Sequence, residues 1–258
     1  MNWKLSLILL IPMLFCACDS SDSDSDSYRY EVTETRLWSG EDLNEMTVTT
    51  VNGNLSFFAI FGETITAEIT KSCEGYDQID AIEHIDDVVI TDSSIGEHLF
   101  LEAEIPDSSK RQYGADFDIT GPGSLHLELV TVNGSIEVNS MISGATIQVV
   151  NGNIGMEHIE GSVSGQSVNG NVDCQYDVLN TGKAINLQTT NGNVILTLPA
   201  DISAAFNAST AIGIVTISGF SNINYTTNEI NHKSGTIGTG SAAINVSTAI
   251  GNITIQAL

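Results

Sequence analysis

The sequence predicts an all-β fold in which the chain winds as a single-stranded parallel β-helix, a solenoid with coils of about 18 residues. Residues 131–175 divide into five successive blocks of nine residues, and the second and sixth positions of every block are apolar. Asn-Gly returns in every second block, which joins the blocks in pairs. The C-terminal half is also rich in Val, Ile, Thr, Ser, Asn and Gly, a composition typical of strands joined by tight turns. A fixed period of this kind indicates structural units that stack on their neighbours to bury their apolar sides.

Asn-Gly between apolar residues is also the strongest short-range signal of a β-hairpin. A series of hairpins gives no reason for Asn-Gly to return in alternate blocks only, whereas a coil of two strands and two turns does. We therefore favour the solenoid, in which stacked asparagine amides form a ladder and each following glycine accepts the positive φ of a sharp corner. The sequence does not determine the handedness, and right-handed is taken as the commoner form. The expected corner residues are Asn133, Gly134, Asn151, Gly152, Asn169, Gly170, Asn191 and Gly192.

Residues 1–17 have the pattern of a signal peptide. A single lysine precedes the apolar run Leu5–Phe15, which is too short for a transmembrane helix. The small residue Ala17 then precedes Cys18, and this resembles the lipobox of bacterial lipoproteins, in which the cysteine is diacylated and becomes the new N-terminus. We expect lipid attachment at Cys18 and an acidic disordered tether over residues 18–27. Cys16 is a rival lipidation site, and the segment could instead be an ordinary cleaved signal or an uncleaved anchor.

Residues 28–258 are expected to form one elongated adhesin-like domain, with acidic first coils or a cap over 28–118 and regular Asn-Gly repeat coils over 119–258. Residues 77–87 depart from the strand pattern, because three isoleucines follow one another there at three-residue spacing. That spacing predicts one short amphipathic helix capped by Asp77. Strands are expected on either side of it, over 28–38, 45–60, 63–70, 88–91 and 98–105, with a loop at 106–114.

The chain carries a formal net charge of −24, from 32 acidic and eight basic residues. This charge argues against nucleic acid as a partner, since binding to nucleic acid depends on Lys and Arg contacts to phosphate. It also argues against broad contact with anionic lipid headgroups, which attract basic segments. The acidic residues are unevenly placed, because 24 of them lie between residues 19 and 118.

Two cysteines, Cys73 and Cys174, remain beyond the N-terminal segment and could form a disulfide in an oxidising envelope compartment. Cys174 occupies the eighth position of its nine-residue block, where other blocks place apolar residues. We therefore favour a buried free thiol at Cys174, and the disulfide stays an open alternative.

The repeat also raises the question of calcium, because nonapeptide β-rolls bind this ion through an aspartate two places after a glycine of each repeat. Here those places hold Ile136, Ile154 and Val172, which are expected in the core. The acidic stretch 77–92 lacks the fixed ligand spacing of an EF-hand loop. We expect neither a metal nor a cofactor.

Some polysaccharide-active enzymes are β-helices, and glycoside hydrolysis needs two carboxylates about 5–10 Å apart. Glu137 and Asp173 hold related block positions but have Gly155 between them, so no such pair is expected there. Asp116 and Asp118 are two residues apart on one expected strand and could project together, a pattern that often arises by chance. The five histidines show no metal-ligand spacing, and the sequence holds no nucleophile elbow or phosphate loop. We expect no enzymatic activity.

Several motifs recur across the C-terminal half: Val-Asn-Gly followed by Asn or Ser and then Ile or Val, the step Leu198-Pro199-Ala200-Asp201, and the related segments 209–213 and 247–253. Together they resemble the bacterial putative-adhesin family, domain of unknown function 4097, over residues 43–258. The resemblance implies a β-helical envelope protein. It assigns no catalytic or binding residue, because the family has no agreed activity and a fold does not establish a function.

These observations lead us to expect a non-enzymatic cell-envelope lipoprotein, held at the inner or outer membrane, whose β-helix is a surface or periplasmic binding module for glycan or protein. The alternative is a structural or regulatory envelope component, such as part of a stress response, and a less favoured one is a polysaccharide-active enzyme. The expected partners are the membrane, through acyl chains on Cys18, and an envelope protein or glycan, with no nucleic acid and the oligomeric state left open. Outward positions that could contact a partner include Thr146, Gln148, Ser162, Ser164 and Gln166.

Overall fold

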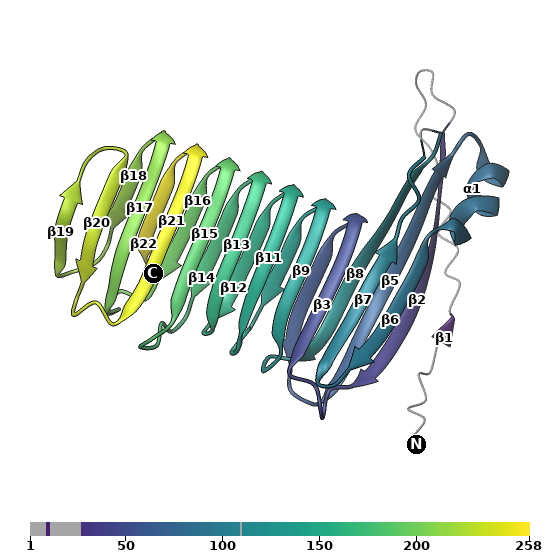
Figure 1. Ribbon diagram of the computed structural model, residues 1–258, viewed down its shortest axis with the longest axis horizontal. Helices are drawn as coiled ribbons and strands as arrows, with labels where there is room; N and C mark the ends of the chain where they lie inside the picture. The colour runs from purple at the N-terminus through teal and green to yellow at the C-terminus, as the bar shows by residue number, and fades with distance from the viewer. Residues whose placement is uncertain (1–8, 11–26, 109) are drawn as a thin grey trace.

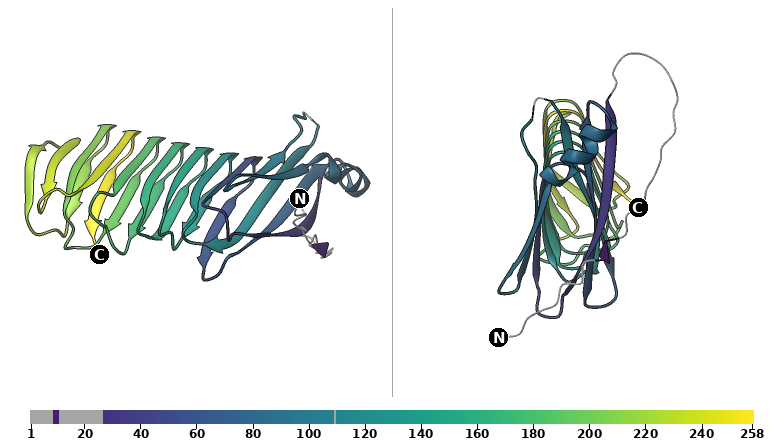
Figure 2. Two further views of the ribbon diagram at one scale, coloured as in Figure 1. Left: turned by 60° about the horizontal axis from the view of Figure 1, so that its bottom comes forward. Right: turned by 90° about the vertical axis from the view of Figure 1, so that its right-hand side faces the viewer.

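The computed structural model describes residues 9–10, 27–108 and 110–258, and these form two β-sheets that lie face to face along one long axis (Figures 1 and 2). Each sheet has eleven described strands. Sheet A contains, in spatial order, β1 Leu9–Leu10, β2 Tyr28–Ser39, β5 Thr64–Gly75, β8 Gln112–Pro122, β4 Leu55–Ile60, β10 Ile136–Asn139, β12 Ile154–Ile159, β14 Val172–Tyr176, β16 Val194–Leu198, β22 Ile253–Ala257 and β18 Val215–Ser218. Sheet B contains β19 Ile223–Asn228, β20 His232–Ile237, β17 Ala204–Ile212, β21 Ala242–Ile250, β15 Ala184–Asn191, β13 Ser162–Asn169, β11 Gly144–Asn151, β9 His126–Asn133, β3 Glu45–Asn52, β7 His98–Glu104 and β6 Val89–Ile95.

The middle of the molecule is a solenoid in which each Asn-Gly turn joins a strand of sheet B to a strand of sheet A. Neighbouring coils pair in parallel, with Ile136 opposite Ile154 and Ile154 opposite Val172. A hairpin series would instead pair consecutive strands in antiparallel fashion within one sheet. The all-β solenoid expected from the repeat is therefore confirmed, and the Asn-Gly sites are its corners.

Alternate residues of each strand point between the two sheets and fill the core. In the middle coils these are the apolar block positions, and Ile136, Ile147 and Ile154 are at most 1% exposed. Ile136 and Ile154 are the residues that replace the aspartates of a calcium β-roll, and their burial explains why an apolar side chain is needed there.

At both ends of the solenoid, the order of the coils in space differs from their order in the sequence. The first coil of the chain and the last one are each inserted between two other coils. At the N-terminal end, the coil of β3 and β4 lies between the coil of β7 and β8 and the coil of β9 and β10. At the C-terminal end, the coil of β21 and β22 lies between that of β15 and β16 and that of β17 and β18. Antiparallel strands then extend both ends, with β5 and β2 beyond β8, β6 beyond β7, and β20 and β19 beyond β17.

Side chains tie the two sheets together at the N-terminal end. Arg36 of β2 in sheet A donates to Asp92 of β6 in sheet B at 2.6 Å, and its other nitrogen donates to the carbonyl of Ile90 at 3.1 Å. Trp38 Nε1 donates to the same aspartate at 3.1 Å. These bonds join β2, near one end of sheet A, to β6, the edge strand of sheet B at the same end of the molecule.

The helical insert contains α1 Gln78–His84 and the 3₁₀ turn η1 Ile85–Asp87. Asp77 caps α1 as expected, because its side chain accepts a bond from the backbone N–H of Asp80. The expected apolar stripe is only partly correct: Ile85 is buried, whereas Ile79 and Ile82 are 68% and 43% exposed. The helix is too short to present three apolar residues to one surface, and it packs through Ala81 and through polar contacts described below.

The expected signal peptide (1–17), Cys18 and nearly all of the expected tether (18–27) lie outside the described residues, apart from Leu9–Leu10 and Ser27. Within the described part of the chain, helices are all too short or too polar to cross a membrane.

Candidate binding surface

The Asn-Gly turns stack along one edge of the solenoid, called here the corner edge, and their first asparagines are joined in a ladder. The amide of Asn151 donates to Asn133 at 2.8 Å, and the amide of Asn169 donates to Asn151 at 2.9 Å. The ladder runs on to Asn191 in one direction and through Asn133 to Asn52 in the other. Its last two places hold Ile250 and Ile212, which are aligned with the asparagines and are 52% and 65% exposed.

A second ladder lies two residues further along each turn. Here a side-chain oxygen accepts a bond from the backbone N–H of the next coil: Asn153 accepts from Asn171 at 2.8 Å, and Asn171 accepts from Asn193 at 2.9 Å. These residues were not among the expected corner residues, although Asn-Gly-Asn occurs at four of the turns and could have indicated them.

A third row lies inside the corner edge and consists of buried hydroxyls. Thr131 donates to the carbonyl of Gly53, Ser167 to that of Gly152 and Thr189 to that of Gly170, at 2.8 to 3.0 Å. Val149 occupies the same place in the coil of β11 and has no hydroxyl to donate. These bonds matter because a turn carbonyl that is shielded from water needs a partner.

Crowding between coils explains the corner glycines better than backbone conformation does. The φ of Gly134 and Gly152 is +150° and +158°, but Gly170 and Gly192 are not among the positive-φ residues, so the expected positive φ is not a general reason. At all four, a Cβ atom would lie 1.9 to 2.0 Å from the carbonyl oxygen of the equivalent glycine in the preceding coil. Glycine is therefore required because the coils touch through their backbones at this edge.

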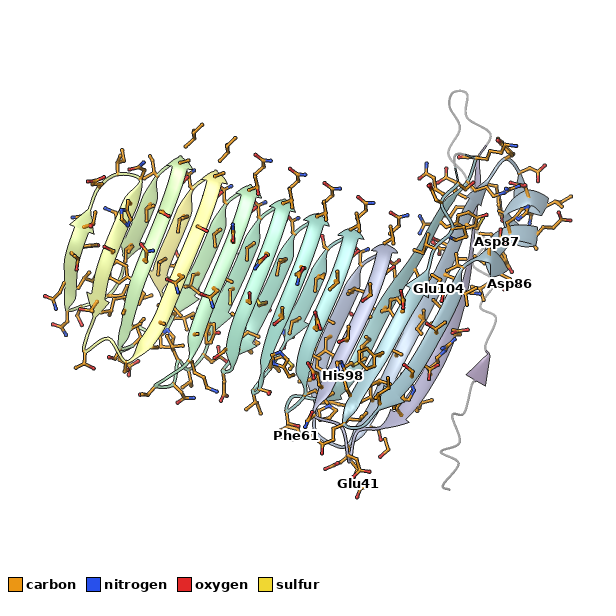
Figure 3. The ribbon with its side chains drawn as sticks, in the orientation of Figure 1. Glu41, Phe61, Asp86, Asp87, His98 and Glu104 are labelled. Carbon is orange, nitrogen blue, oxygen red and sulfur yellow. The ribbon has the colours of Figure 1, made fainter. Side chains whose placement is uncertain are left out.

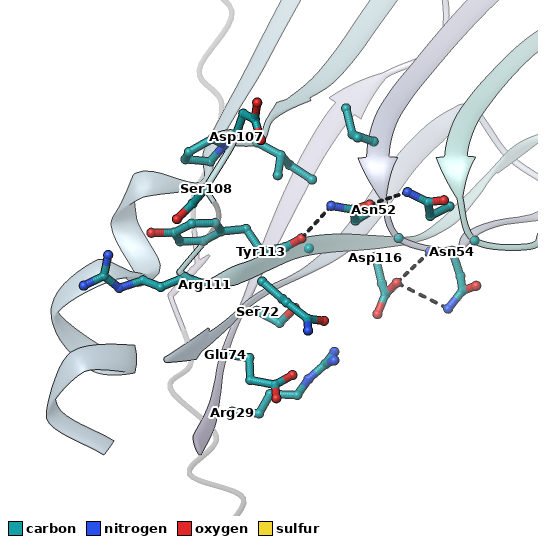
Figure 4. Close-up of a pocket in the computed structure, with 18 residues that line it drawn as sticks. Arg29, Asn52, Asn54, Ser72, Glu74, Asp107, Ser108, Arg111, Tyr113 and Asp116 are labelled. Atoms are coloured by element: carbon teal, nitrogen blue, oxygen red, sulfur yellow. Dashed lines mark hydrogen bonds between the residues drawn. The ribbon is translucent and has the colours of Figure 1, made fainter. Parts of the chain in front are cut away.

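The corner edge ends in an open groove of about 840 Å³ where it meets the N-terminal strands (Figure 4). Its lining includes Arg29, Asn52, Asn54, Glu74, Arg111, Tyr113 and Asp116. We call this the corner groove. Its floor is fixed by hydrogen bonds, since Asn52 donates to the carbonyl of Tyr113 at 3.0 Å and Asp116 accepts from the backbone N–H of Asn54 at 2.6 Å. A polar surface that is already held in place loses little conformational freedom when a partner binds.

An ion-pair network fixes the wall of the groove to the helix. Arg111 binds both carboxylate oxygens of Asp80, at 3.0 and 2.5 Å, and Tyr113 donates to Asp87 at 2.9 Å. The bonds from Arg111 hold the pKa of Asp80 below its usual value, and the bonds from Tyr113 and His84 do the same for the pKa of Asp87. Burial, followed by the bond to Asp87, raises the pKa of Tyr113 to about 12. Figure 3 shows Asp86 and Asp87 beside α1, within the acidic N-terminal part of the molecule.

The outer face of sheet B carries aligned rows of polar side chains, which we call the sheet B rows. Of the outward positions that the sequence indicated, Gln148 and Gln166 are exposed, and Thr146, Ser162 and Ser164 are partly exposed. The first row contains Thr146, Ser164, Asn186, Asn245 and Asn207, and the second contains Gln148, Gln166, Gln188, Ser247 and Ser209. Val150, Val168, Thr190, Ala249 and Ala211 form a third row on the side of the corner edge.

The carboxylates considered for catalysis are separated or occupied. Glu137 and Asp173 lie on β10 and β14, with Gly155 of β12 between them in the register. Asp116 accepts from Asn54, and Asp118 accepts from Ser56 Oγ at 2.5 Å.

Each of four histidines has a local partner. His84 lies near Asp87, His98 near Thr47, His158 near Asp177 and His232 near Asn207. Among the described residues, no group of three or more His, Cys, Asp or Glu side chains is placed to hold a metal ion.

Both described cysteines, Cys73 and Cys174, are buried free thiols in the structure. Burial raises the pKa of each thiol. Cys174 lies on β14 between the sheets with its side chain fully buried, and this agrees with the free thiol favoured from its block position.

The sequence matches the family model of Toastrack DUF4097 over residues 22–256. No curated protein sequence matches the chain. Among solved structures it is similar to a "putative cell adhesion protein" from Clostridium sporogenes, with a TM-score of 0.48 and 12% identity over 89% of this chain and 100% of that one. It is also similar to a "putative adhesin" from Bacteroides fragilis, with a TM-score of 0.42 and 12% identity over 86% of this chain and 96% of that one. The family expected from the sequence motifs is thus confirmed, and the chain belongs to the Toastrack DUF4097 family.

Proposed function

We propose that the protein is a non-enzymatic lipoprotein of the cell envelope that binds a glycan or protein partner through the corner groove. The observation that carries this proposal is the groove itself, which combines carboxylates, amides and the two guanidinium groups of Arg29 and Arg111 on a surface fixed by hydrogen bonds. Binding sites present a few well-placed polar groups of this kind on a rigid support. Arg29 and Glu74 line the groove and present charges of opposite sign there, with Arg29 also bonded to Glu31 at 2.7 Å and Glu74 accepting from Ser27 Oγ.

The environment of the carboxylates supports a binding role over catalysis. Glycoside hydrolysis needs one carboxyl that is protonated and one that is free to act as base or nucleophile. Of the carboxylates that line the groove, Asp116 accepts from the backbone of Asn54 and Glu74 accepts from Ser27 Oγ. Behind the groove wall, Asp80 is bound by Arg111. These contacts use the carboxylates to fix the shape of the surface.

Membrane attachment through acyl chains on Cys18 is the second part of the proposal. It is supported by the sequence, where a short apolar run ends in a small residue and a cysteine. Two acyl chains suffice for stable anchoring. Fractionation of cells that express Cys18→Ser should show loss of membrane association, and an unchanged distribution would refute the anchor.

A third part concerns the solenoid, which we propose to be right-handed with coils of about 18 residues. The register supports the coil length over β9 to β14, where Gly144 pairs with His126 and with Ser162. An experimental structure checks the hand.

The binding proposal is tested with the protein carrying Cys18→Ser, applied to a glycan array and mixed with purified envelope proteins. We expect one ligand to bind the parent and to lose affinity for the double variant Arg29→Gln, Glu74→Gln. The matched control is Glu229→Gln with Lys233→Gln, which also removes one charge of each sign but lies at the C-terminal end. Equal binding by both double variants would refute the groove as the site. A single stoichiometric protein partner would identify the protein as an envelope component with a structural or regulatory role.

A further inference from the structure

The outer face of sheet B is free of charge over five neighbouring strands, in a protein with a net charge of −24. The strands β17, β21, β15, β13 and β11 contain no Asp, Glu, Lys, Arg or His. The outer face of sheet A differs, since Glu137, Glu157 and Asp173 lie on the strands opposite. A face that only has to be soluble is normally mixed with charged residues, so solubility does not explain this one.

The face offers hydrogen-bonding groups at a regular spacing. Gln148, Gln166 and Gln188 are exposed and aligned on three successive strands, which lie about 4.8 Å apart. Their amides make no hydrogen bond to any residue that the structure describes. Each can therefore donate to and accept from a molecule that lies across the strands.

An apolar strip accompanies the glutamines on the side of the corner edge. Val150 and Val168 are 39% and 42% exposed, and they lie two residues beyond Gln148 and Gln166 on the same strands. Two shallow hollows, of about 320 and 190 Å³, lie along this part of the sheet, and Gln166 and Gln188 line both of them. They form a track along the solenoid axis with apolar contacts on one side and amides in the middle.

We propose that this track binds a neutral, linear glycan whose chain runs along the solenoid axis. The absence of charge on the five strands complements a neutral ligand and offers nothing to an ionic one. Sugar rings present both C–H surfaces and hydroxyls, which match the valines and the glutamines. An extended glycan advances by a distance close to one strand spacing per ring, so the five strands would contact about five rings. The track is separate from the corner groove, and the proposal stands without the function proposed there.

The test is calorimetric titration of the full chain with neutral oligomers of glucose or N-acetylglucosamine, joined by β-1,4 links and two to six units long. Oligogalacturonate and chitosan oligomers serve as anionic and cationic comparisons. For one of the neutral series we expect affinity to rise with length up to about five units and then level off, because each strand adds one contact. The affinity should be unchanged by added salt, since no ionic contact is involved.

The variant that tests the site is the triple Gln148→Ala, Gln166→Ala, Gln188→Ala. We expect its affinity to fall about tenfold or more, because three amides each lose a hydrogen bond to the ligand. The matched control is Gln175→Ala with Gln256→Ala, which removes two amides from sheet A and should bind like the parent. Thermal unfolding of all variants checks that the fold is kept.

Three results would overturn the proposal: no binding of any neutral oligomer, tighter binding of a charged one, or binding by the triple variant equal to that of the parent. The groove variant Arg29→Gln, Glu74→Gln should retain oligomer binding. Loss in that variant alone would place the glycan in the corner groove, which would refute the track and support the other proposal.

Discussion

The most direct test of the corner edge is Gly170→Ala. This glycine has no positive φ, so an added methyl group tests crowding between coils alone. The new Cβ would lie 1.9 Å from the carbonyl oxygen of Gly152, whereas real Cβ contacts are essentially never shorter than 3.0 Å. The coils of β12 and β14 must therefore separate by about an ångström at this point.

The cost follows from the bonds that such a separation stretches. The backbone bond from Gly152 to the carbonyl of Asn169 is 3.0 Å long, the bond from Ser167 to the carbonyl of Gly152 is 3.0 Å, and the bond from Asn171 to Asn153 is 2.8 Å. Another ångström takes all three beyond hydrogen-bonding distance. At about 1 kcal/mol each, the unfolding free energy should fall by about 3 kcal/mol.

Gly155→Ala is the matched control, because Gly155 lies on β12 and a Cβ there meets only the Cγ of Glu137, at 3.7 Å. Replacing a glycine where alanine fits is neutral or stabilises by up to about 1 kcal/mol, since the unfolded chain loses freedom. Urea unfolding followed by far-UV circular dichroism measures both variants against the parent. If Gly170→Ala costs less than about 1 kcal/mol, or no more than the control, crowding is not the reason for the corner glycines.

Three further predictions concern other parts of the structure. Thr189→Val removes the buried bond to the carbonyl of Gly170 and should lower the unfolding free energy by about 1 kcal/mol, which the same urea titration checks. Because Arg111 lowers the pKa of Asp80 in the fold, Asp80→Asn should be less stable than the parent at neutral pH. The difference should start to shrink as the pH falls below the ordinary aspartate value of 3.8, and it should be lost once the pH falls below the lowered pKa of the folded state. A difference in unfolding free energy that does not shrink between neutral pH and pH 3 would contradict that assignment. Deleting β21 and β22 should abolish hydrogen-exchange protection in β17 to β20 while β9 to β14 stay protected. Among the described strands, it is this coil that pairs with the C-terminal end on one side and with the body on the other, in both sheets.

The repeat made the solenoid predictable, because apolar block positions and Asn-Gly sites repeat with one period and each has one structural role. The ladder of Asn133, Asn151 and Asn169 follows from that period once the coils are stacked. The reason for the glycines did not follow, since a contact between backbones of different coils leaves no pattern of side chains in the sequence. The expectation that Ile79 and Ile82 are covered was wrong. Three-residue spacing indicates an apolar helical face, but it does not indicate whether another part of the protein packs on that face.

The corner groove could not be predicted from the sequence, for a different reason. Its lining comes from β2, β3, β5, β8, the loop before β8, the end of β9 and the first two Asn-Gly turns, which the topology of the N-terminal end brings together from well-separated parts of the chain. The coil of β3 and β4 is inserted beside a coil that comes later in the sequence, and no repeat signals this order. The sheet B rows were easier to predict from the sequence than the corner groove. The block pattern already placed Thr146, Gln148, Ser164 and Gln166 among the outward positions.

Because the inserted coils, β3 with β4 and β21 with β22, lie at the two ends, the length of the molecule can change without any change to its ends. The coils from β9 to β14 stack in the same order as in the sequence, and the inserted coils at the two ends lie outside this region. Duplication of one repeat unit there, such as the segment from Gly144 to Gly161, would add one strand to each sheet and lengthen the body by about 4.8 Å. Selection could therefore set the length of such a protein by changing the number of middle coils, with the coils and strands at both ends left as they are.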